Sequence, residues 1–253
     1  MVDQLIDASF LYPGIVILLV GSAELGFRIG FRHRRHKYRS EDLATLTAST
    51  LGLLALLLAF SLSHALSRYD DRRALVLEEA NAIESTANFA SMLPEQTQAP
   101  IFNVLRDYAA IRIGLGFPYD PVRFDHDVAK SKDLLTTLWQ QAGAVAEPET
   151  RSAQRFIKSL DEMTKIQERR VVSLRYYVPS AVLLMLLGMG IVAIWFTGYQ
   201  SGLTETRLHA GTVIMAFTIA VVIALVIDLD QPARGLVQVP TQALIDAAKG
   251  LPP

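Results

Sequence analysis

The segment 57–86 reads LLAFSLSHALSRYDDRRALVLEEANAIEST. Its beginning is apolar enough for lipid, its end carries the charges of a helix in water, and no Gly or Pro separates the two. Because Gly and Pro are the residues that most often interrupt a helix, this segment predicts one helix that leaves a membrane and continues into solvent. The polar side chains at the transition are Ser61, Ser63, His64, Ser67, Arg68, Asp71 and Arg72.

The chain contains four apolar windows. They cover residues 10–31, 44–66, 178–199 and 208–229, and they dominate the 51% hydrophobic content of the 253-residue chain. Each window is about 20 residues long, which is enough to cross a hydrocarbon core of roughly 30 Å as a helix. No segment shows the alternation of a β-strand. The sequence therefore predicts an all-α, polytopic membrane protein with four transmembrane helices, paired into hairpins over 10–66 and 178–229.

Residues 67–177 have balanced charge and apolar residues at helical spacing. This pattern predicts an extramembrane helical bundle inserted between spans 2 and 3. One helix is expected to open on Pro100, and another to start at Asp125, a good N-cap residue. The outer helices of the bundle are expected to continue spans 2 and 3 without a break. Residues 230–253 are expected to form an extended C-terminal tail.

The loop 32–43 determines the predicted orientation. Six Lys or Arg and two His lie between Arg28 and Arg39, and short basic loops stay in the cytoplasm. The N-terminus, the C-terminus and the bundle are then expected outside. Basic residues within 68–73 and 165–175 favour the opposite orientation, but loops longer than about 60 residues are translocated largely regardless of their charge.

Composition disfavours several classes of function. The chain has no Cys, so it can have no disulfide, thiolate metal site or cysteine nucleophile. A net charge of −1 gives no reason to expect nucleic acid as a partner. The sequence has no phosphate-binding or catalytic motif, so we expect neither an enzyme nor a cofactor. His33 and His36 are flanked by Arg, which favours a role in orientation or a contact with anionic lipid over a metal site.

The polar residues of span 2 gather on one side when they are placed on a helix. Five small residues fall within a sector of roughly 80°, together with Leu56 and Phe60. The five are Thr45, Ser49, Gly52, Ser63 and Ser67. Ser61, His64 and Arg68 occupy the adjoining sector. Such a face can line a water-filled path, where hydroxyls and His64 replace part of an ion's hydration. It can also pack tightly against another helix through small residues and interhelical hydrogen bonds.

Further charged residues lie near the ends of the spans. Glu24 and Arg28 stand at positions i and i+4, which favours a snorkelling ion pair over a role in ion or proton passage. Asp228 and Asp230 end span 4. They can attract cations, hold Arg residues of neighbouring helices, or simply mark the exit of the helix. Together with Arg72, these four residues are the structural ion-pair candidates.

Four segments together resemble the bestrophin-like domain family of bacterial membrane proteins, and the resemblance spans nearly the whole chain. They are AELGFRIGFRHRR at 23–35, LGLLALLLAFSLSHALSRYDDRRALVLEEANAI at 51–83, RVVSLRYYVP at 170–179 and ALVIDLDQPARGLVQV at 224–239. The second segment is the most specific. The resemblance assigns ten residues to the family's characteristic positions: Arg68, Asp71, Arg72, Glu79, Asn81, Pro179, Asp228, Asp230, Pro232 and Gly235.

The resemblance implies a location in a bacterial inner membrane and kinship with pentameric anion channels built from four-span subunits. The chain departs from true bestrophins in two respects. Those proteins hold their termini and large helical region in the cytoplasm, whereas the charge pattern here puts that region outside. Their aromatic neck motif is also not identifiable in this sequence.

Two functions are therefore predicted as alternatives, both within a lipid bilayer. The first is a homo-oligomeric channel for inorganic ions, a pentamer or tetramer, with a pore lined by span 2. Anions are its first expected cargo, from the resemblance, and cations stay open. Its pore-lining candidates are Ser61, Ser63, His64, Ser67, Arg68 and Asp71. The second function is a non-conducting membrane sensor or scaffold that signals through the external bundle.

Overall fold

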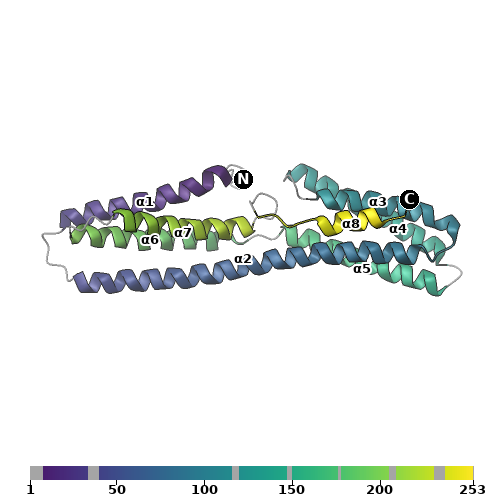
Figure 1. Ribbon diagram of the computed structural model, residues 1–253, viewed down its shortest axis with the longest axis horizontal. Coiled ribbons are helices and arrows are strands. Elements are labelled where there is room, and N and C mark those ends of the chain that lie inside the picture. The colour runs from purple at the N-terminus through teal and green to yellow at the C-terminus, as the bar shows by residue number, and fades with distance from the viewer. Residues whose placement is uncertain are drawn as a thin grey trace. The chain divides into compact units, whose positions relative to one another are not determined.

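The computed structural model describes residues 8–33, 40–115, 120–146, 150–175, 178–204, 209–230 and 237–252. Over these residues the secondary structure consists of helices and includes no strand, which confirms the all-α prediction (Figure 1). The helices are α1 Ala8–His33, α2 Ser40–Ala90, α3 Glu95–Gly114, α4 Pro121–Val145, α5 Arg151–Arg175, α6 Ser180–Leu203, α7 His209–Asp230 and α8 Gln242–Gly250.

Four helical stretches of the described chain are long and apolar enough to cross a membrane. They are Tyr12–His33 in α1, Leu43–Ala90 in α2, Arg151–Leu203, which contains α6, and Ala210–Asp230 in α7. Their number is the one that the four apolar windows predict. α2 runs without interruption from Ser40 to Ala90, so the segment 57–86 lies within one helix.

The chain divides into two compact units. The first, here called the membrane unit, comprises Met1–Ser67 and Val178–Gln231. The second, the bundle unit, comprises Arg68–Tyr177 and Pro232–Pro253. The most apolar residues of all four stretches belong to the membrane unit. The parts of α2 and of Arg151–Leu203 that carry charged residues belong to the bundle unit.

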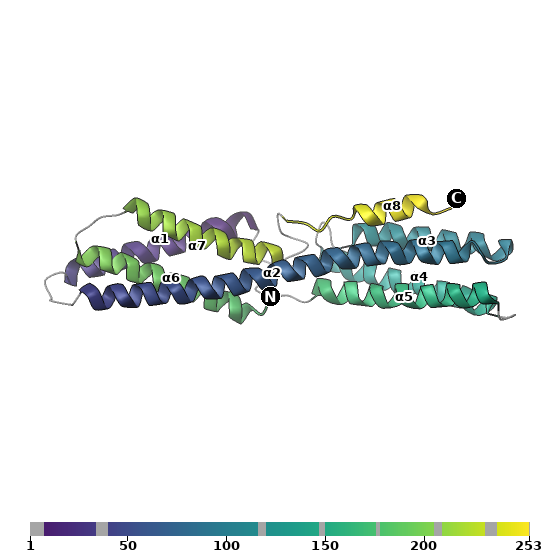
Figure 2. The same ribbon diagram turned by 60° about the horizontal axis from the view of Figure 1, so that its bottom comes forward.

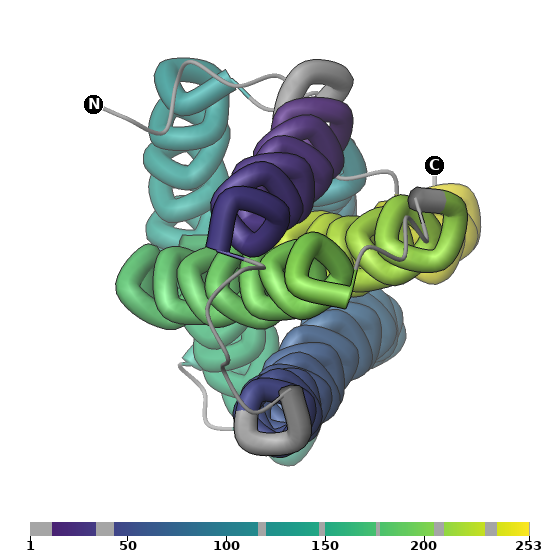
Figure 3. The backbone as a smooth tube through the Cα atoms, turned by 90° about the vertical axis from the view of Figure 1, so that its left-hand side faces the viewer, coloured from purple at the N-terminus to yellow at the C-terminus, as the bar shows by residue number. Residues whose placement is uncertain are grey.

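The membrane unit is built around α1, α6 and α7 (Figure 3). Buried residues of the first part of α2 join the core of this unit. Its core joins Leu19 of α1, Leu54 and Leu58 of α2, Ile194 of α6 and Ile223 of α7. All five side chains are buried. Because these residues come from all four helices, the two predicted hairpins share one apolar core.

The closest contact in the membrane unit is between the backbones of α1 and α6. Gly26 and Gly30 of α1 and Gly198 and Gly202 of α6 lie where the two helices meet. A Cβ atom on any of the four would overlap a main-chain carbonyl oxygen of the opposite helix. Small residues spaced four apart on both partners permit this approach in membranes, where dispersion rather than water drives helix association.

The bundle unit packs the second part of α2 with α3, α4, α5 and α8 around one core (Figure 2). Ile83, Leu105, Phe156 and Leu160 are fully buried in that core. Leu244 of α8 joins them with no exposed surface. The expectation of an extended tail over 230–253 is therefore wrong. Residues 242–250 form a helix that packs on α3, because its apolar side chains find a partner there.

Two helix starts in the bundle differ from the sequence prediction. α3 begins at Glu95, directly after Pro94, and not at Pro100. Pro100 lies in the second turn, where its missing N–H removes a single hydrogen bond of the helix. α4 begins at Pro121, not at Asp125. The carboxylate of Asp120 accepts the Val122 N–H at 2.9 Å, which makes Asp120 the N-cap, and Pro at the first position suits a helix start.

The expected unbroken helix from the bundle into span 3 is also wrong. α5 ends at Arg175, and α6 starts at Ser180 with Pro179 as its N-cap. Val178 and Pro179 are not helical. A proline disfavours helical conformation in the residue before it, so Pro179 separates the two helices.

Candidate functional site

The span part of α2 contacts its own protomer along a narrow stripe. Thr47, Leu54, Leu58 and Ala65 are buried there, each with at most 7% of its surface exposed. Their spacings of 7, 4 and 7 residues keep them on one side of a helix. The remaining circumference of this span is half-buried or exposed.

The small, hydroxyl-bearing face of α2 lies opposite that stripe. At 100° per residue, its members point roughly 180° away from Leu54 and Ala65. All five are exposed: Thr45, Ser49, Gly52, Ser63 and Ser67. Within the most apolar window of each membrane stretch, α2 has 17% of its residues buried, against 39%, 22% and 28% for the other three. The hydroxyl face is thus not used for packing inside one protomer.

The other pore-lining candidates divide between two sides of α2. His64 and Asp71 are exposed. Ser61 and Arg68 are half-buried and flank the packed stripe. The structure thus groups Ser63 and Ser67 on the open face and turns Ser61 and Arg68 towards the protomer's own helices.

Arg72 continues the packed stripe of α2 into the bundle unit. Its side chain is 4% exposed, and its Nε donates to the carbonyl oxygen of Ser173 at 3.4 Å. This contact links α2 to α5 within the bundle. Arg72 is therefore positioned to hold two helices together.

The acidic pair at the end of α7 binds helix ends within the membrane unit. The Tyr12 hydroxyl donates to Oδ1 of Asp228 at 2.7 Å, and the main-chain N–H of Val178 donates to Oδ2 of Asp230 at 2.7 Å. Both carboxylates are nearly buried. The two carboxylates thus join α7 to the first turns of α1 and to the residues directly before α6. Pro232 and Gly235 lie outside the described residues.

The pair near the other end of α1 is exposed. Nε of Arg28 donates to Oε1 of Glu24 at 2.8 Å, with 69% and 41% of the two side chains accessible. The pair thus has the i, i+4 geometry of an ion pair within one helix. Among the residues that the structure covers, no three His, Asp or Glu side chains gather in a way that could hold a metal ion.

The bundle contains a buried charge cluster, formed by Glu79, Tyr108, Arg112 and Arg170. Oε1 of Glu79 accepts the Tyr108 hydroxyl at 2.8 Å and Nε of Arg112 at 2.5 Å. Oε2 accepts Nη2 of Arg112 at 3.3 Å and Nη1 of Arg170 at 2.5 Å. Nη1 of Arg170 also donates to the Arg112 carbonyl oxygen at 3.2 Å. The cluster thus ties α2, α3 and α5 together at one point.

The electrostatics of the cluster favour an ionised carboxylate. Burial alone would raise the pKa of Glu79, but the charges and hydrogen bonds of Arg112 and Arg170 outweigh it and hold the pKa below its usual value. Burial, and then the charge of Glu79, raise the pKa of Tyr108 well above its usual value. The phenol therefore stays protonated and acts as a donor to Glu79.

Sequence reasoning pointed to only one member of this cluster, since Glu79 falls on a characteristic family position. The signal for the others lies in spacing. Arg112 follows Ile101, Leu105 and Tyr108 on the apolar side of α3, and all four are buried. A charge that recurs in phase with buried apolar residues indicates a partner in the core.

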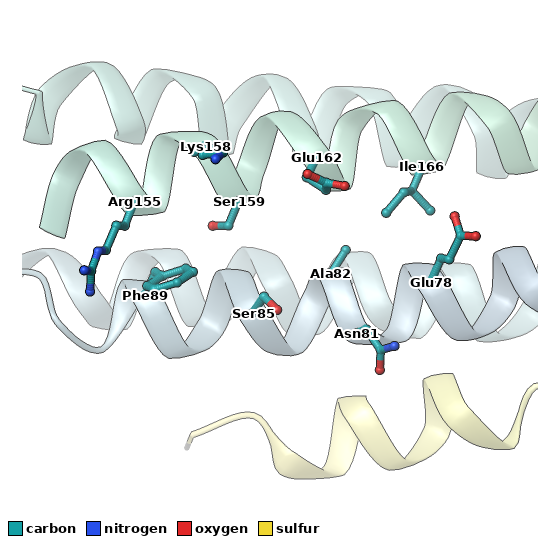
Figure 4. A pocket seen from close by; sticks show the side chains of 10 residues that line it. All are labelled: Glu78, Asn81, Ala82, Ser85, Phe89, Arg155, Lys158, Ser159, Glu162 and Ile166. Carbon is teal, nitrogen blue, oxygen red and sulfur yellow. The ribbon is translucent and has the colours of Figure 1, made fainter. Parts of the chain in front are cut away.

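A groove of about 560 Å³ lies between α2 and α5 in the bundle unit (Figure 4). Figure 4 shows Arg155 and Phe89 at one end and Glu78 at the other. The remaining lining residues are Asn81, Ala82, Ser85, Lys158, Ser159, Glu162 and Ile166. Acids and bases both line the groove, so it favours no single ligand charge. Asn81, one of the characteristic family positions, lies on its wall.

Comparison with known proteins gives one family and one fold. The sequence matches the Bestrophin-like domain over residues 15–244. Among solved structures, a single-site variant of a bacterial bestrophin homologue from Klebsiella pneumoniae is similar, with a TM-score of 0.73, 14% identity, and coverage of 94% of this chain and 96% of the other. Another structure of that homologue has a TM-score of 0.69, 15% identity, and coverage of 94% and 98%. No curated protein matches the sequence.

Proposed function

Because the chain belongs to the Bestrophin-like domain family, we propose that it assembles into a homo-oligomeric membrane ion channel with a pore lined by the hydroxyl face of α2. The observation that carries the proposal is the exposure of that face. Ser63 and Ser67 lie directly opposite the stripe by which α2 packs in its own protomer. They are available to a central path or to a neighbouring subunit.

The chemistry of the face suits a path for small ions. A hydroxyl oxygen accepts from water or coordinates a cation, and its O–H donates to an anion. Thr45, Ser49, Ser63 and Ser67 repeat this group at helical spacing along the span. Lipid tails offer no hydrogen-bond partner to exposed hydroxyls, whereas a wet path or a second helix does.

The absence of Cys from the chain makes a direct test possible. Ser63→Cys and Ser67→Cys each introduce a unique thiol on the proposed pore face. With the variants reconstituted in planar bilayers, a charged methanethiosulfonate reagent should modify both and reduce the ionic current. Ala65→Cys is the matched control, because residue 65 is in the same turn but fully buried in the packed stripe. It should neither react nor change the current.

Two outcomes would contradict the proposal, the first for conduction itself and the second for the pore lining. One is an ionic flux equal to that of empty liposomes under several ion gradients. The other is a current that is unaffected while both thiols at residues 63 and 67 stay unreactive, which would assign the face to contacts between helices. A third measurement, the reversal potential in an asymmetric KCl gradient, decides between anions, which the family resemblance favours, and cations.

The continuity of α2 supports a second candidate. A helix that runs from Ser40 to Ala90 could act as a lever in a non-conducting sensor or scaffold. In that case the purified protein should form a stable particle without flux. A partner bound to the bundle should then change the labelling rate of a thiol in the span of α2.

The proposed orientation keeps loop 32–43 in the cytoplasm and the bundle outside. It is supported by the six basic residues between Arg28 and Arg39. A membrane-impermeant maleimide applied to intact cells tests it. It should label a cysteine at Lys158, in the bundle, and not one at Lys37. The reverse pattern would place the bundle in the cytoplasm.

A further inference from the structure

We propose that the bundle binds one small monovalent anion, of halide or nitrate size, at the guanidinium of Arg112, as a structural ligand of the buried charge cluster. This site lies within the bundle unit and is separate from the proposed pore face of α2. The inference stands on the charge and hydrogen bonding of the cluster, so it does not depend on whether the protein conducts ions.

The charge cluster has more positive than negative side chains. Arg112 and Arg170 each carry a positive charge, and among the described residues Glu79 is the one acid that pairs with them. The side chains of Arg112 and Glu79 have no exposed surface, and that of Arg170 has 5%. The cluster therefore holds a net charge of +1 away from water. An uncompensated buried charge is strongly destabilising, whereas a counter-ion removes most of that cost.

The cluster also contains a donor that no described residue uses. Glu79 is saturated, since its two oxygens accept hydrogen bonds from Tyr108, Arg112 and Arg170. Nη1 of Arg112 is buried and has no hydrogen-bond partner among the described residues. The guanidinium faces Glu79 with its Nε and Nη2 side, so Nη1 is directed away from the carboxylate.

A second unused donor, on Gln167, lies one helical turn from Arg170 on α5. Nε2 of Gln167 is also buried without a partner in the described structure, and the residue is 1% exposed. Gln167 and Arg170 stand at positions i and i+3, which places them on the same face of α5. Arg170 in turn touches the Arg112 main chain. Both unused donors thus belong to residues that adjoin Arg170, one along α5 and the other through the Arg112 main chain.

The missing partner is better matched by an anion than by water. Both unused groups are N–H donors, and an anion accepts several hydrogen bonds without donating any. A water molecule would bring two hydrogens of its own into a region where the Glu79 oxygens are already occupied. The ring of Tyr108 lies 5.8 Å from Cζ of Arg112. It moderates the charge through its π face but gives Nη1 no acceptor.

Thermal unfolding of the full chain in detergent tests the proposal. Chloride, bromide or nitrate would replace gluconate at constant ionic strength, so that charge screening stays the same. We expect the melting temperature, followed by helical circular dichroism, to rise along a saturating curve. At a halide concentration one hundred times the dissociation constant, the rise should be roughly 5–10 °C. Gluconate is too large for a closed site and should have no such effect.

Two variants make the test specific. Gln167→Met keeps the side-chain volume but removes the second donor, and should raise the halide concentration at half-saturation about tenfold. Gln140→Met, at an exposed position of α4, is the matched control and should behave as the wild type. Equal melting temperatures of the wild type in halide and in gluconate would overturn the proposal.

A crystallographic measurement locates the ion without any substitution. Crystals grown in bromide should give an anomalous difference peak within hydrogen-bond distance of Nη1 of Arg112. Ordered bromide found only elsewhere in the protein, or a water molecule at Nη1 in its place, would refute the site. Because neither measurement involves conduction, failure here leaves the proposed channel untouched, and absence of flux leaves the anion site untouched.

Discussion

Arg112 binds the carboxylate of Glu79 through two nitrogens, with Nε 2.5 Å from Oε1 and Nη2 3.3 Å from Oε2. Neither side chain is exposed to solvent. The two residues are 33 positions apart in the chain. With Arg170 on the other oxygen, this contact fixes the mutual placement of α2, α3 and α5. Because the charges are buried, the contact is far more sensitive to the loss of one member than a surface ion pair is.

Removing the carboxylate should therefore destabilise the bundle strongly. Glu79→Gln removes the carboxylate that pairs with both buried arginines, and we expect a loss of about 3–5 kcal/mol in the free energy of unfolding. Glu78→Gln is the matched control, since Glu78 precedes it in the chain and pairs with Arg169 at the surface at 3.0 Å. Its loss should be about 1 kcal/mol or less. Chemical denaturation followed by circular dichroism gives both values, and similar losses would refute the role of the cluster.

Acid should weaken the bundle through the same residue. Burial would raise the pKa of Glu79, but Arg112 and Arg170 keep it below the value of 4.5 that the group has when free. A carboxyl with a lowered folded pKa contributes its stability above the unfolded pKa and loses it as pH falls towards the folded pKa. The free energy of unfolding should thus decrease below about pH 4.5.

The same two variants separate Glu79 from the other carboxyls in this pH range. Glu79→Gln has no proton to take up at that position, so its stability should fall less steeply with acid than that of the wild type. The stability of Glu78→Gln, which keeps Glu79, should fall more steeply with acid than that of Glu79→Gln. Parallel slopes for all three proteins between neutral and acidic pH would show that Glu79 is not the titrating group.

The contact between α1 and α6 should not tolerate a methyl group. Gly198→Ala places a Cβ against the carbonyl of Ala23, and either the helices separate or the backbone distorts, at a cost of about 1–3 kcal/mol. Gly188→Ala, on the same helix, meets nothing within 4 Å. That control should be neutral or up to about 1 kcal/mol more stable, because alanine favours a helix. Thermal unfolding in one detergent compares them, and equal stability would contradict the close contact.

The last helix should be part of the bundle's core. Leu244→Ala removes a fully buried side chain of α8 and should cost about 2–5 kcal/mol. Lys249→Ala changes an exposed residue of the same helix and should stay within about 0.5 kcal/mol of the wild type. Hydrogen exchange of α3 should accelerate only in the first variant. Unchanged protection there would mean that α8 does not pack on α3.

The parts of the fold that depend on local pattern could be predicted from the sequence. Apolar length alone gives the four candidate spans, and the absence of Gly and Pro between residues 57 and 86 gives the unbroken course of α2. The helix expected across residues 175–180 is interrupted before Ser180, because Pro179 disfavours a helical conformation in the residue before it. α8 was missed because nine residues make a marginal helix by themselves. Its stability comes from packing on residues far away in the chain.

The buried sites depend on pairings that no local pattern contains. Glu79 contacts Arg112 and Arg170 across 33 and 91 positions of the chain. The apolar spacing around Arg112 indicates a partner in the core, but no local pattern shows which residue that partner is. The glycines of α1 and α6 likewise become informative only when the two helices face each other. By contrast, the hydroxyl face of α2 follows from helix geometry within one segment, so it could be identified before the fold was known.

The packing of α8 has a consequence for the order in which the chain folds. The core of the bundle unit joins Ile83, Leu105 and Phe156 to Leu244, so its last component is synthesised after both helices of the second hairpin. During the intervening synthesis, on the order of several seconds at typical elongation rates, α3 carries an uncovered apolar surface. Completion of the bundle thus follows synthesis of all four spans, and a chain truncated before α8 would expose that surface to chaperones and proteases.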